Sequence, residues 1–182
     1  GGVAGFFGRH IETFIMRLTD IMFGFPVLLF LIAITTVFEP NLMVVFIAIG
    51  VVTWPGMARL VRGQVLSIKT QEYVLAARAL GLGSGDVLWK HVFPNCISPI
   101  IVAYTLGVGS AILAEASLSF LGLGAQPPTA SWGSMISLGK DFIRTAPWIS
   151  VAPGAVIAIT VLGFNLVGDS IRDHLDPKMN SK

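Results

Sequence analysis

The chain has 182 residues, of which 54% are hydrophobic and 12% are charged, and its mean hydropathy is +0.79. This composition excludes an ordinary soluble domain and predicts an integral membrane protein in contact with lipid. The net charge of +2 is too small and too scattered for a nucleic-acid-binding surface, and the single cysteine, Cys96, allows neither an internal disulfide nor a cysteine metal cluster.

The N-terminal residues predict the approach to a first membrane span. Residues 1–8, GGVAGFFG, contain neither a methionine nor a signal-like segment, so we expect them to be the tail of an earlier span in a longer protein. Residues 9–20 mix charged and bulky side chains at helical spacing, which predicts an interfacial turn. The uncharged run 21–38 is long enough to cross the membrane, and Gly24 with Pro26 should kink it.

Further uncharged runs predict three more spans. Each has at least the roughly 17 residues that a helix needs to cross about 30 Å of hydrocarbon. These runs are residues 42–58, 92–114 and 145–168. A fifth run, 116–139, contains a proline pair and several glycines, so we interpret it as an irregular outer loop. The sequence therefore predicts four full transmembrane helices plus the tail of an earlier one.

Prolines predict where several helices bend or end. The second span ends near Trp54-Pro55-Gly56, where the tryptophan is typical of an interfacial anchor and the Pro-Gly pair of a kink or a gating hinge. A short helix expected at 86–92 should end at Pro94. Ser98 and Pro99 then have the order expected at the start of the third span.

A polar loop, residues 67–95, separates the second and third spans. Thr70 is a candidate N-cap, Glu72 lies in the first turn, and Gly81 supplies a left-handed stop, which together delimit a helix at 71–80. Several residues of this helix are small, so that a partner could approach it closely, and they are Ala76, Ala77 and Ala79.

The basic residues predict the orientation of the chain. Of the twelve Lys and Arg residues, ten lie on the side of the polar loop, whereas Lys140 and Arg144 lie on the other side. By the positive-inside rule, the loop 67–95 and the C-terminus are cytoplasmic, and the loop 122–144 faces outward.

Side chains that could carry covalent chemistry or hold a metal are dispersed. His10, His91 and His174 are far apart in sequence, which disfavours a metal site. The GLGSGDVLWK stretch lacks the Gly-Lys-Ser/Thr ending of a phosphate loop, and the serines in the spans lack a histidine base. We therefore expect no catalytic residue, no metal site and no cofactor bound by this chain.

Glu115 is the one acid inside a long apolar stretch. A carboxylate in hydrocarbon costs about 2.5–3.5 kcal/mol on insertion scales, so it should face protein or a water-filled cavity. Two interpretations remain open. Glu115 lines a translocation route, where it would favour an amino terminus or a cation, or it makes a structural hydrogen bond to Ser117, Ser119 or a neighbouring helix.

The polar loop resembles the cytoplasmic EAA loop of ATP-binding-cassette importer permeases. The matching positions are Glu72, Ala76, Ala77, Gly81 and Pro94. The segments TWPGMARLVRGQVL, AILAEASLSFLGLGAQPPTASWG and FNLVGDSIRDHLDPK further resemble the C-type subunit of the peptide and nickel branch. The resemblance covers nearly the whole chain. Its minor departures lie at Leu75, Val92 and Phe93.

The resemblance implies an all-α permease transmembrane domain over residues 1–182, N-terminally incomplete, in the inner membrane of a bacterium. Such a subunit forms the membrane pathway for peptides or a related small solute and is not an enzyme. Nickel or another chelated metal is the alternative cargo. A channel or secondary transporter is the alternative class, but ionisable groups near the middle of the membrane would then be expected.

The resemblance also implies partners and site residues. The partners are ATP-binding subunits, which bind the ATP, a second homologous permease subunit and an extracytoplasmic solute-binding protein. Contact with an ATP-binding subunit is implied for Glu72, Ala76, Ala77 and Gly81, with Arg78 at the rim.

Overall fold

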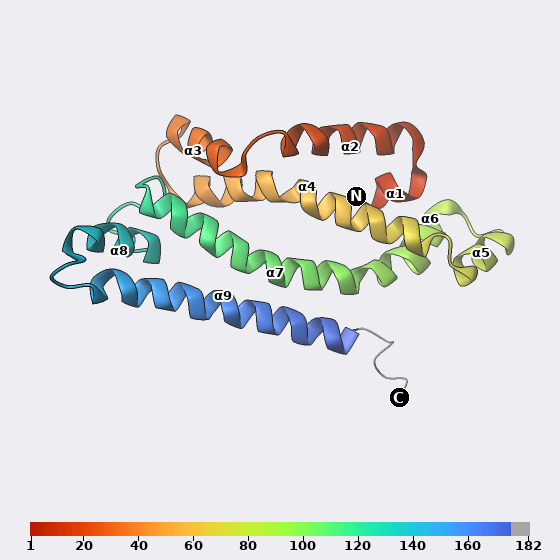
Figure 1. Cartoon of the computed structure of the whole chain (residues 1–182). Helices are drawn as coiled ribbons and strands as arrows, with labels where there is room; N and C mark the ends of the chain where they lie inside the picture. Colours follow the sequence, from red (N-terminus) through yellow and green to blue (C-terminus); the bar gives the residue numbers. More distant parts are fainter. Residues whose placement is uncertain (176–182) are drawn as a thin grey trace. The chain divides into compact units, whose positions relative to one another are not determined.

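The computed structural model describes residues 1–175, which form helices joined by short connections (Figure 1). The helices are α1 (Gly2–Phe7), α2 (Arg9–Phe23), α3 (Val27–Val37), α4 (Leu42–Ile68), α5 (Glu72–Ala79), α6 (Ser84–Asp86), the π-helix η1 (Val87–Val92), α7 (Phe93–Phe120), α8 (Trp132–Gly139), the 3-10 helix η2 (Lys140–Phe142) and α9 (Trp148–Leu175). Among the described residues there is no strand, and the predicted all-α membrane fold is confirmed. The predicted cytoplasmic C-terminus, with Lys178 and Lys182, lies outside the described residues.

Three helical stretches are long and apolar enough to cross a membrane, namely α4, Ser84–Phe120 and α9. The first predicted span, 21–38, is not one continuous helix, because α2 ends at Phe23 and α3 begins at Val27. Pro26 lies between them in an extended conformation, with φ −61° and ψ 117°. Proline lacks a backbone N–H and keeps the residue before it out of the helical region, so the helix breaks here. Counting α2 and α3 together as one broken span gives four.

Other prolines interrupt the helices less than the sequence predicts. Helix α4 runs through Pro55 to Ile68, and α7 runs through Pro99, so the expected helix end and helix start at these positions are wrong. Pro94 lies in the first turn of α7, which continues directly from η1, and does not end the preceding helix. Prolines are tolerated in membrane helices where neighbouring groups satisfy the freed backbone carbonyls.

The chain divides into two compact units. Unit 1 contains Gly1–Gly24, Trp54–Tyr104 and the end of α9 from Ser170. Its buried cluster joins side chains of α1, α4, α5, η1 and α7, which are Phe6, Val61, Val65, Val74, Val87, Leu88, Val92 and Cys96. Residues far apart in sequence thus fix the polar loop to the helices around it.

Unit 2 contains Phe25–Thr53 and Thr105–Asp169. Its buried cluster consists of Leu31, Val45, Ala48, Ile49 and Leu118. Glycine allows α8 to approach α7 closely, because a Cβ at Gly133 would collide with the backbone carbonyl of Ala116. The expected irregular loop over 116–139 is therefore only partly correct. Helix α7 continues to Phe120, and α8 forms after an irregular stretch.

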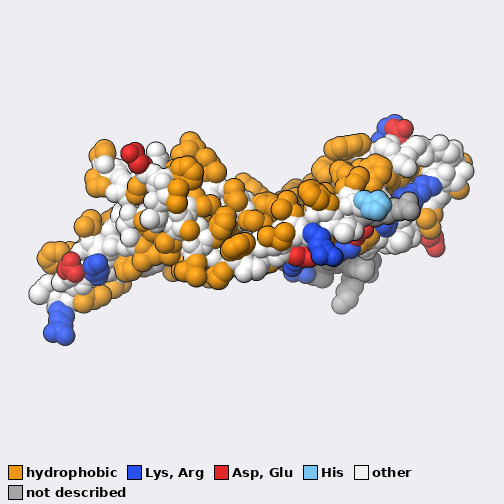
Figure 2. All heavy atoms as spheres, turned by 90° about the horizontal axis from the view of Figure 1, so that it is seen from above, with side chains coloured by type: hydrophobic (Ala, Val, Ile, Leu, Met, Phe, Trp, Pro, Cys, Tyr) orange, Lys and Arg blue, Asp and Glu red, His pale blue; other side chains and the backbone are white. Residues whose placement is uncertain are grey.

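Hydrophobic side chains cover much of the face shown in Figure 2 (orange). Large apolar residues of the candidate spans are exposed, among them Phe46, Ile159 and Leu166. Exposed apolar patches of this extent are rare on monomeric soluble proteins and fit contact with lipid.

Candidate functional site

Helix α5 of the polar loop ends in a defined backbone motif. Gly81 N–H donates to the carbonyl of Arg78 at 2.9 Å, and Leu82 N–H donates to the carbonyl of Ala77 at 3.3 Å. Gly81 has φ +86°, in the left-handed region. These bonds and this angle form a Schellman motif, so the predicted stop at Gly81 is confirmed.

The start of α5 differs from the prediction. Gln71 is the N-cap residue and makes no side-chain capping bond, whereas the Thr70 hydroxyl donates to the carbonyl of Ser67 at 2.9 Å. The proposed cap at Thr70 is therefore wrong. Glu72 is the first residue of the helix and is exposed. Its carboxylate lies at the positive end of the helix dipole, a position worth roughly 0.3–1 kcal/mol.

The residues of α5 separate into two faces. Val74 is fully buried and Ala77 is 7% exposed, and both point into unit 1. Glu72, Ala76 and Ala79 are exposed on the opposite side, as the helical period of 3.6 residues requires. The resemblance predicts Ala77 as a docking residue, whereas the structure places it on the inner face. Its small side chain allows α5 to pack closely against its own unit.

Two exposed leucines flank the outward alanines. Leu75 is 51% exposed and Leu80 is 82% exposed. Neither leucine is among the docking residues that the sequence predicts. The helical period places Leu75 and Leu80 away from the inner face once Val74 and Ala77 are known to be buried, which the sequence alone does not show. We call the set Glu72, Leu75, Ala76, Ala79 and Leu80 the outward face of α5.

Arg78 contacts the chain itself. Its guanidinium carbon lies 5.1 Å from the ring centroid of Phe6, a buried residue of α1. A cation over an aromatic ring is worth about 0.5–1 kcal/mol at an exposed site. Lys69, the residue after α4, also contacts α1, because its Nζ donates to the carbonyl of Gly5 at 3.0 Å. Helix α1 thus contacts both the end of α4 and the last turn of α5.

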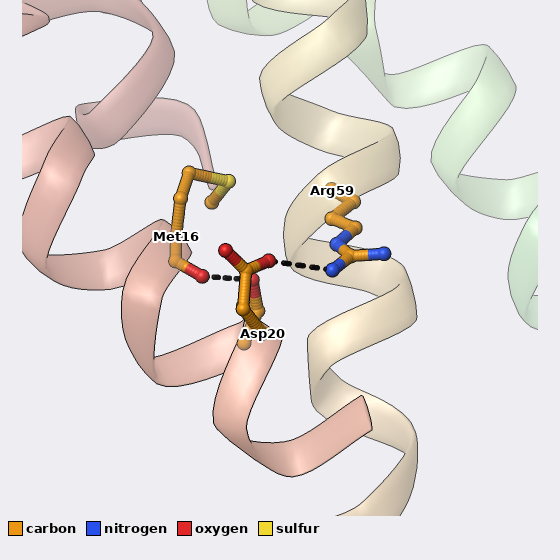
Figure 3. A network of polar contacts seen from close by, with 4 residues as sticks. Met16, Asp20 and Arg59 are labelled. Carbon is orange, nitrogen blue, oxygen red and sulfur yellow. Dashed lines mark hydrogen bonds and ion pairs between the residues drawn. The ribbon is translucent and has the colours of Figure 1, made fainter. Parts of the chain in front are cut away.

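Ion pairs attach α2 to the part of α4 in unit 1. Arg62 pairs with Glu12, and its Nε donates to Glu12 Oε1 at 2.6 Å. Arg59 pairs with Asp20 at 2.6 Å, as Figure 3 shows, and its guanidinium lies 4.1 Å from the ring centroid of Phe23. Two contacts separated by about two turns of α2 hold this helix antiparallel to α4.

Glu115 lies in unit 2 on the wall of a cavity of about 530 Å³. The hydroxyl of Ser119 donates to Glu115 Oε1 at 2.6 Å and accepts a bond from the backbone N–H of Ala125 at 3.1 Å. Ser117 instead donates to the carbonyl of Leu113. The structural hydrogen bond that the sequence left open is therefore made with Ser119, and the carboxylate also lines a cavity.

The described residues bring no group of three His, Cys, Asp or Glu side chains together in a way that could hold a metal ion. Three acids of unit 1 pair with cations, namely Glu12, Asp20 and Asp86, and the Asp86 pair with Lys90 at 2.7 Å lies within the polar loop. The candidate site of unit 1 is the outward face of α5, a set of exposed side chains.

Residues 1–181 match the protein family described as "Binding-protein-dependent transport system inner membrane component". The chain is 48% identical over 181 residues to the dipeptide transport system permease protein DppC of Alkalihalophilus pseudofirmus, with 100% of the chain and 60% of that protein covered.

Two further relatives have similar names. The oligopeptide transport system permease protein OppC of Bacillus subtilis is 45% identical over 98% of the chain and 59% of its own length. The di/tripeptide transport system permease protein DppC of Pseudomonas aeruginosa is 44% identical over 100% of the chain and 60% of its own length. The chain thus spans 59–60% of the length of these curated relatives.

Proposed function

The chain belongs to the family of binding-protein-dependent transport system inner membrane components, and we propose that it forms part of the membrane pathway of an ATP-driven importer for short peptides. The names of the similar proteins refer to dipeptides, oligopeptides and di/tripeptides, which favours peptides over nickel as the cargo. The chain performs no covalent step in this proposal.

The outward face of α5 is the observation that carries the proposal. A helix of 8 residues with a Schellman stop presents small side chains between two exposed leucines. Its inner face is fixed in the core of unit 1 through Val74 and Ala77. A partner that pulls on this face therefore moves a packed unit rather than a loose loop. An ATP-binding subunit that changes shape on ATP hydrolysis is such a partner.

The proposal assigns the ATP to partner subunits and the loop 67–95 to the cytoplasm. A second homologous permease subunit completes the pathway, and an extracytoplasmic binding protein delivers the solute. Glu72, Ala76 and Gly81 contact the ATP-binding subunit directly. Ala77 acts through its buried position in unit 1, and Arg78 acts through its contact with Phe6 of α1.

Enlarging the outward face tests the docking. In the full-length permease within its complete complex, Ala76→Leu adds bulk to the outward face without lowering helix propensity much. We expect the ATP-binding subunit to bind at least about tenfold more weakly, which corresponds to about 1.4 kcal/mol. Co-purification measures the binding of the ATP-binding subunit, and peptide-stimulated ATP hydrolysis measures whether the bound subunit still responds to the peptide.

Ser84→Leu is the matched control, because Ser84 is exposed in the same loop but lies outside α5. It should leave co-purification and hydrolysis unchanged. Normal ATPase binding by a correctly inserted Ala76→Leu protein would refute the docking. Absence of labelled-dipeptide uptake by the complete wild-type complex in proteoliposomes would refute the peptide importer itself.

A further inference from the structure

The cavity in unit 2 has walls from three helices. The walls come from the first half of α4, from α7, and from the start of α8 with the two residues before it. The lining residues are Leu42, Phe46 and Ile49 of α4, Val108, Ala111, Ile112 and Glu115 of α7, and Ala130, Ser131, Trp132 and Met135 at the start of α8. Among these lining residues Glu115 alone carries a charge. The volume of the cavity, about 530 Å³, lies within the range of about 300–1,000 Å³ that small-molecule sites have.

Glu115 is oriented by its neighbours. Ser119 is 2% exposed, and its hydroxyl is fixed between the Ala125 N–H and the Glu115 carboxylate. Glycine at position 124 is required beside it, because a Cβ there would collide with Ser119. The carboxylate therefore has a defined place on the cavity wall rather than a free range of rotamers.

The hydrogen bond from Ser119 is neutral and uses only Oε1 of the carboxylate. The ion pairs among the described residues involve Asp20, Glu12 and Asp86 and none of them includes Glu115. A half-buried carboxylate in apolar surroundings is stabilised by a cation more than by any neutral donor. The site thus has a place for one positive charge.

The walls around that place are apolar and partly aromatic. Phe46 on α4 and Trp132 on α8 line the cavity together with Met135, which is 44% exposed. A fitting ligand has a positive charge directly attached to an apolar body. A free carboxylate would be repelled by Glu115, and a metal ion would find a single acidic ligand here.

We propose that this cavity binds the amino-terminal end of the transported peptide, with the α-ammonium group at Glu115 and an apolar first side chain against Phe46, Trp132 and Met135. This inference rests on the proposed peptide-import function and adds a subsite to it. Glu115 is a binding residue in this assignment, and Ser119 is a positioning residue.

Protection of an engineered cysteine tests the subsite without relying on a binding protein. Met135→Cys places a thiol on the cavity wall, whereas Leu138→Cys on the same helix is 71% exposed and does not line the cavity. The native Cys96 is buried and serves as the unlabelled background. The full-length permease complex is placed in vesicles of phosphatidylcholine and phosphatidylglycerol, which contain no primary amine.

Leucyl-alanine at millimolar concentration should slow maleimide labelling of Met135→Cys and leave Leu138→Cys unaffected. N-acetyl-leucyl-alanine should give little protection, because its amino group carries no charge. Adding Glu115→Gln should raise the dipeptide concentration needed for half-protection at least about tenfold, and Glu115→Asp should restore part of the loss.

Several results would overturn the proposal. They are equal protection by the acetylated dipeptide, unchanged protection in Glu115→Gln, and a Met135→Cys thiol that the reagent does not reach in the complex. Equal protection by phosphatidylethanolamine alone would assign the cavity to lipid. If instead the wild-type complex imports no dipeptide at all, the function proposed above fails, so the two failures are distinguishable.

Discussion

Single glycines determine where two helices of this chain stop. Gly81 ends α5, and Gly122, with φ +80°, ends α7 through the same pair of bonds, from Gly122 N–H to Ser119 O and from Leu123 N–H to Leu118 O. Both positions require a left-handed backbone that other residues adopt at a cost. The stop at Gly81 lies in the middle of the polar loop. The stop at Gly122 lies next to Ser119, whose carbonyl accepts the bond from Gly122 N–H.

Gly81→Ala should impair the stop of α5. A residue with a Cβ in the left-handed region costs about 1–2 kcal/mol, which lowers the equilibrium constant for forming the native turn by a factor of roughly 5–30. We expect peptide-stimulated ATP hydrolysis by the complete complex to fall, by at most this factor, at unchanged permease abundance. Gly85→Ala is the control, because a Cβ there meets no atom within 4 Å and φ is not positive. Equal activity of both variants would argue against a role for the stop.

Gly133→Ala should weaken the packing of α8 on α7. The added methyl would occupy the space of the Ala116 carbonyl, and overpacking of this kind costs about 1–3 kcal/mol. Thermal unfolding of the purified full-length permease should show a Tm lowered by several degrees. Gly163→Ala in α9, where a methyl meets nothing within 4 Å, should not lower the Tm. A Gly133→Ala protein as stable as the wild type would mean that α8 is placed differently.

At the scale of elements, α2 is attached to α4 by polar contacts and leaves its apolar side chains exposed. Phe14 is 72% and Ile21 is 60% exposed, whereas Glu12 and Asp20 pair with α4. The Arg62–Glu12 pair is the less exposed one, with side-chain exposures of 35% and 22%, compared with 47% and 59% for Arg59–Asp20. Screening by water should make the two pairs unequal in strength.

Charge exchange between α2 and α4 measures this difference. Arg62→Glu alone should destabilise the permease by about 1 kcal/mol, and the double exchange Glu12→Arg with Arg62→Glu should recover most of that loss. The same cycle with Asp20 and Arg59 should give a smaller coupling, because this pair is more exposed to water. Thermal unfolding of the wild type, the single variants and the double variants gives the coupling energy of each pair. A larger coupling for the exposed pair would contradict the arrangement of α2.

The sequence predicts the helical fold and the helix end at Gly81 correctly. It is wrong where the helix-breaking tendency of proline opposes the stability of a long apolar helix. The stop at Gly81 follows from glycine's backbone alone and is correct. Pro55 and Pro99 stand inside long helices, because the apolar surroundings keep a helix intact where proline alone would break it. Ser131 and Ser134 form the capping box of α8 by bonding to each other's backbone N–H groups, whereas the nearby Pro127-Pro128 pair predicts an irregular loop.

The candidate sites could be predicted only in part for a similar reason. Glu115 was found because an acid in an apolar run is unusual, and its bond to Ser119 follows from the helical spacing of four residues. The contact of Arg78 with Phe6 depends on α1, which lies far away in sequence, and the burial of Ala77 depends on the packing of unit 1. Local patterns do not contain such contacts.

For the molecule as a whole, the apolar spans and the distribution of Lys and Arg predict one orientation in the membrane. Lys140→Cys lies in η2 beyond α8, and Ser84→Cys lies in the polar loop; both positions are exposed. An impermeant maleimide added to spheroplasts should label Lys140→Cys, and it should label Ser84→Cys only after permeabilisation. The native protein is the control, because Cys96 is fully buried. Labelling in the opposite pattern would invert the topology.

The π-helical turn η1, which leads from the polar loop into α7, should tolerate the deletion of one residue. A π-turn holds one residue more than the α-helical turn it replaces. Removal of a single residue from Val87–Val92 would convert η1 into regular α-helix and leave the helices on either side facing as before. The same deletion within α7 or α9 would rotate all later side chains by about 100° around the helix axis. Among the long helical stretches described, η1 is therefore where related chains can differ by one residue without loss of the fold.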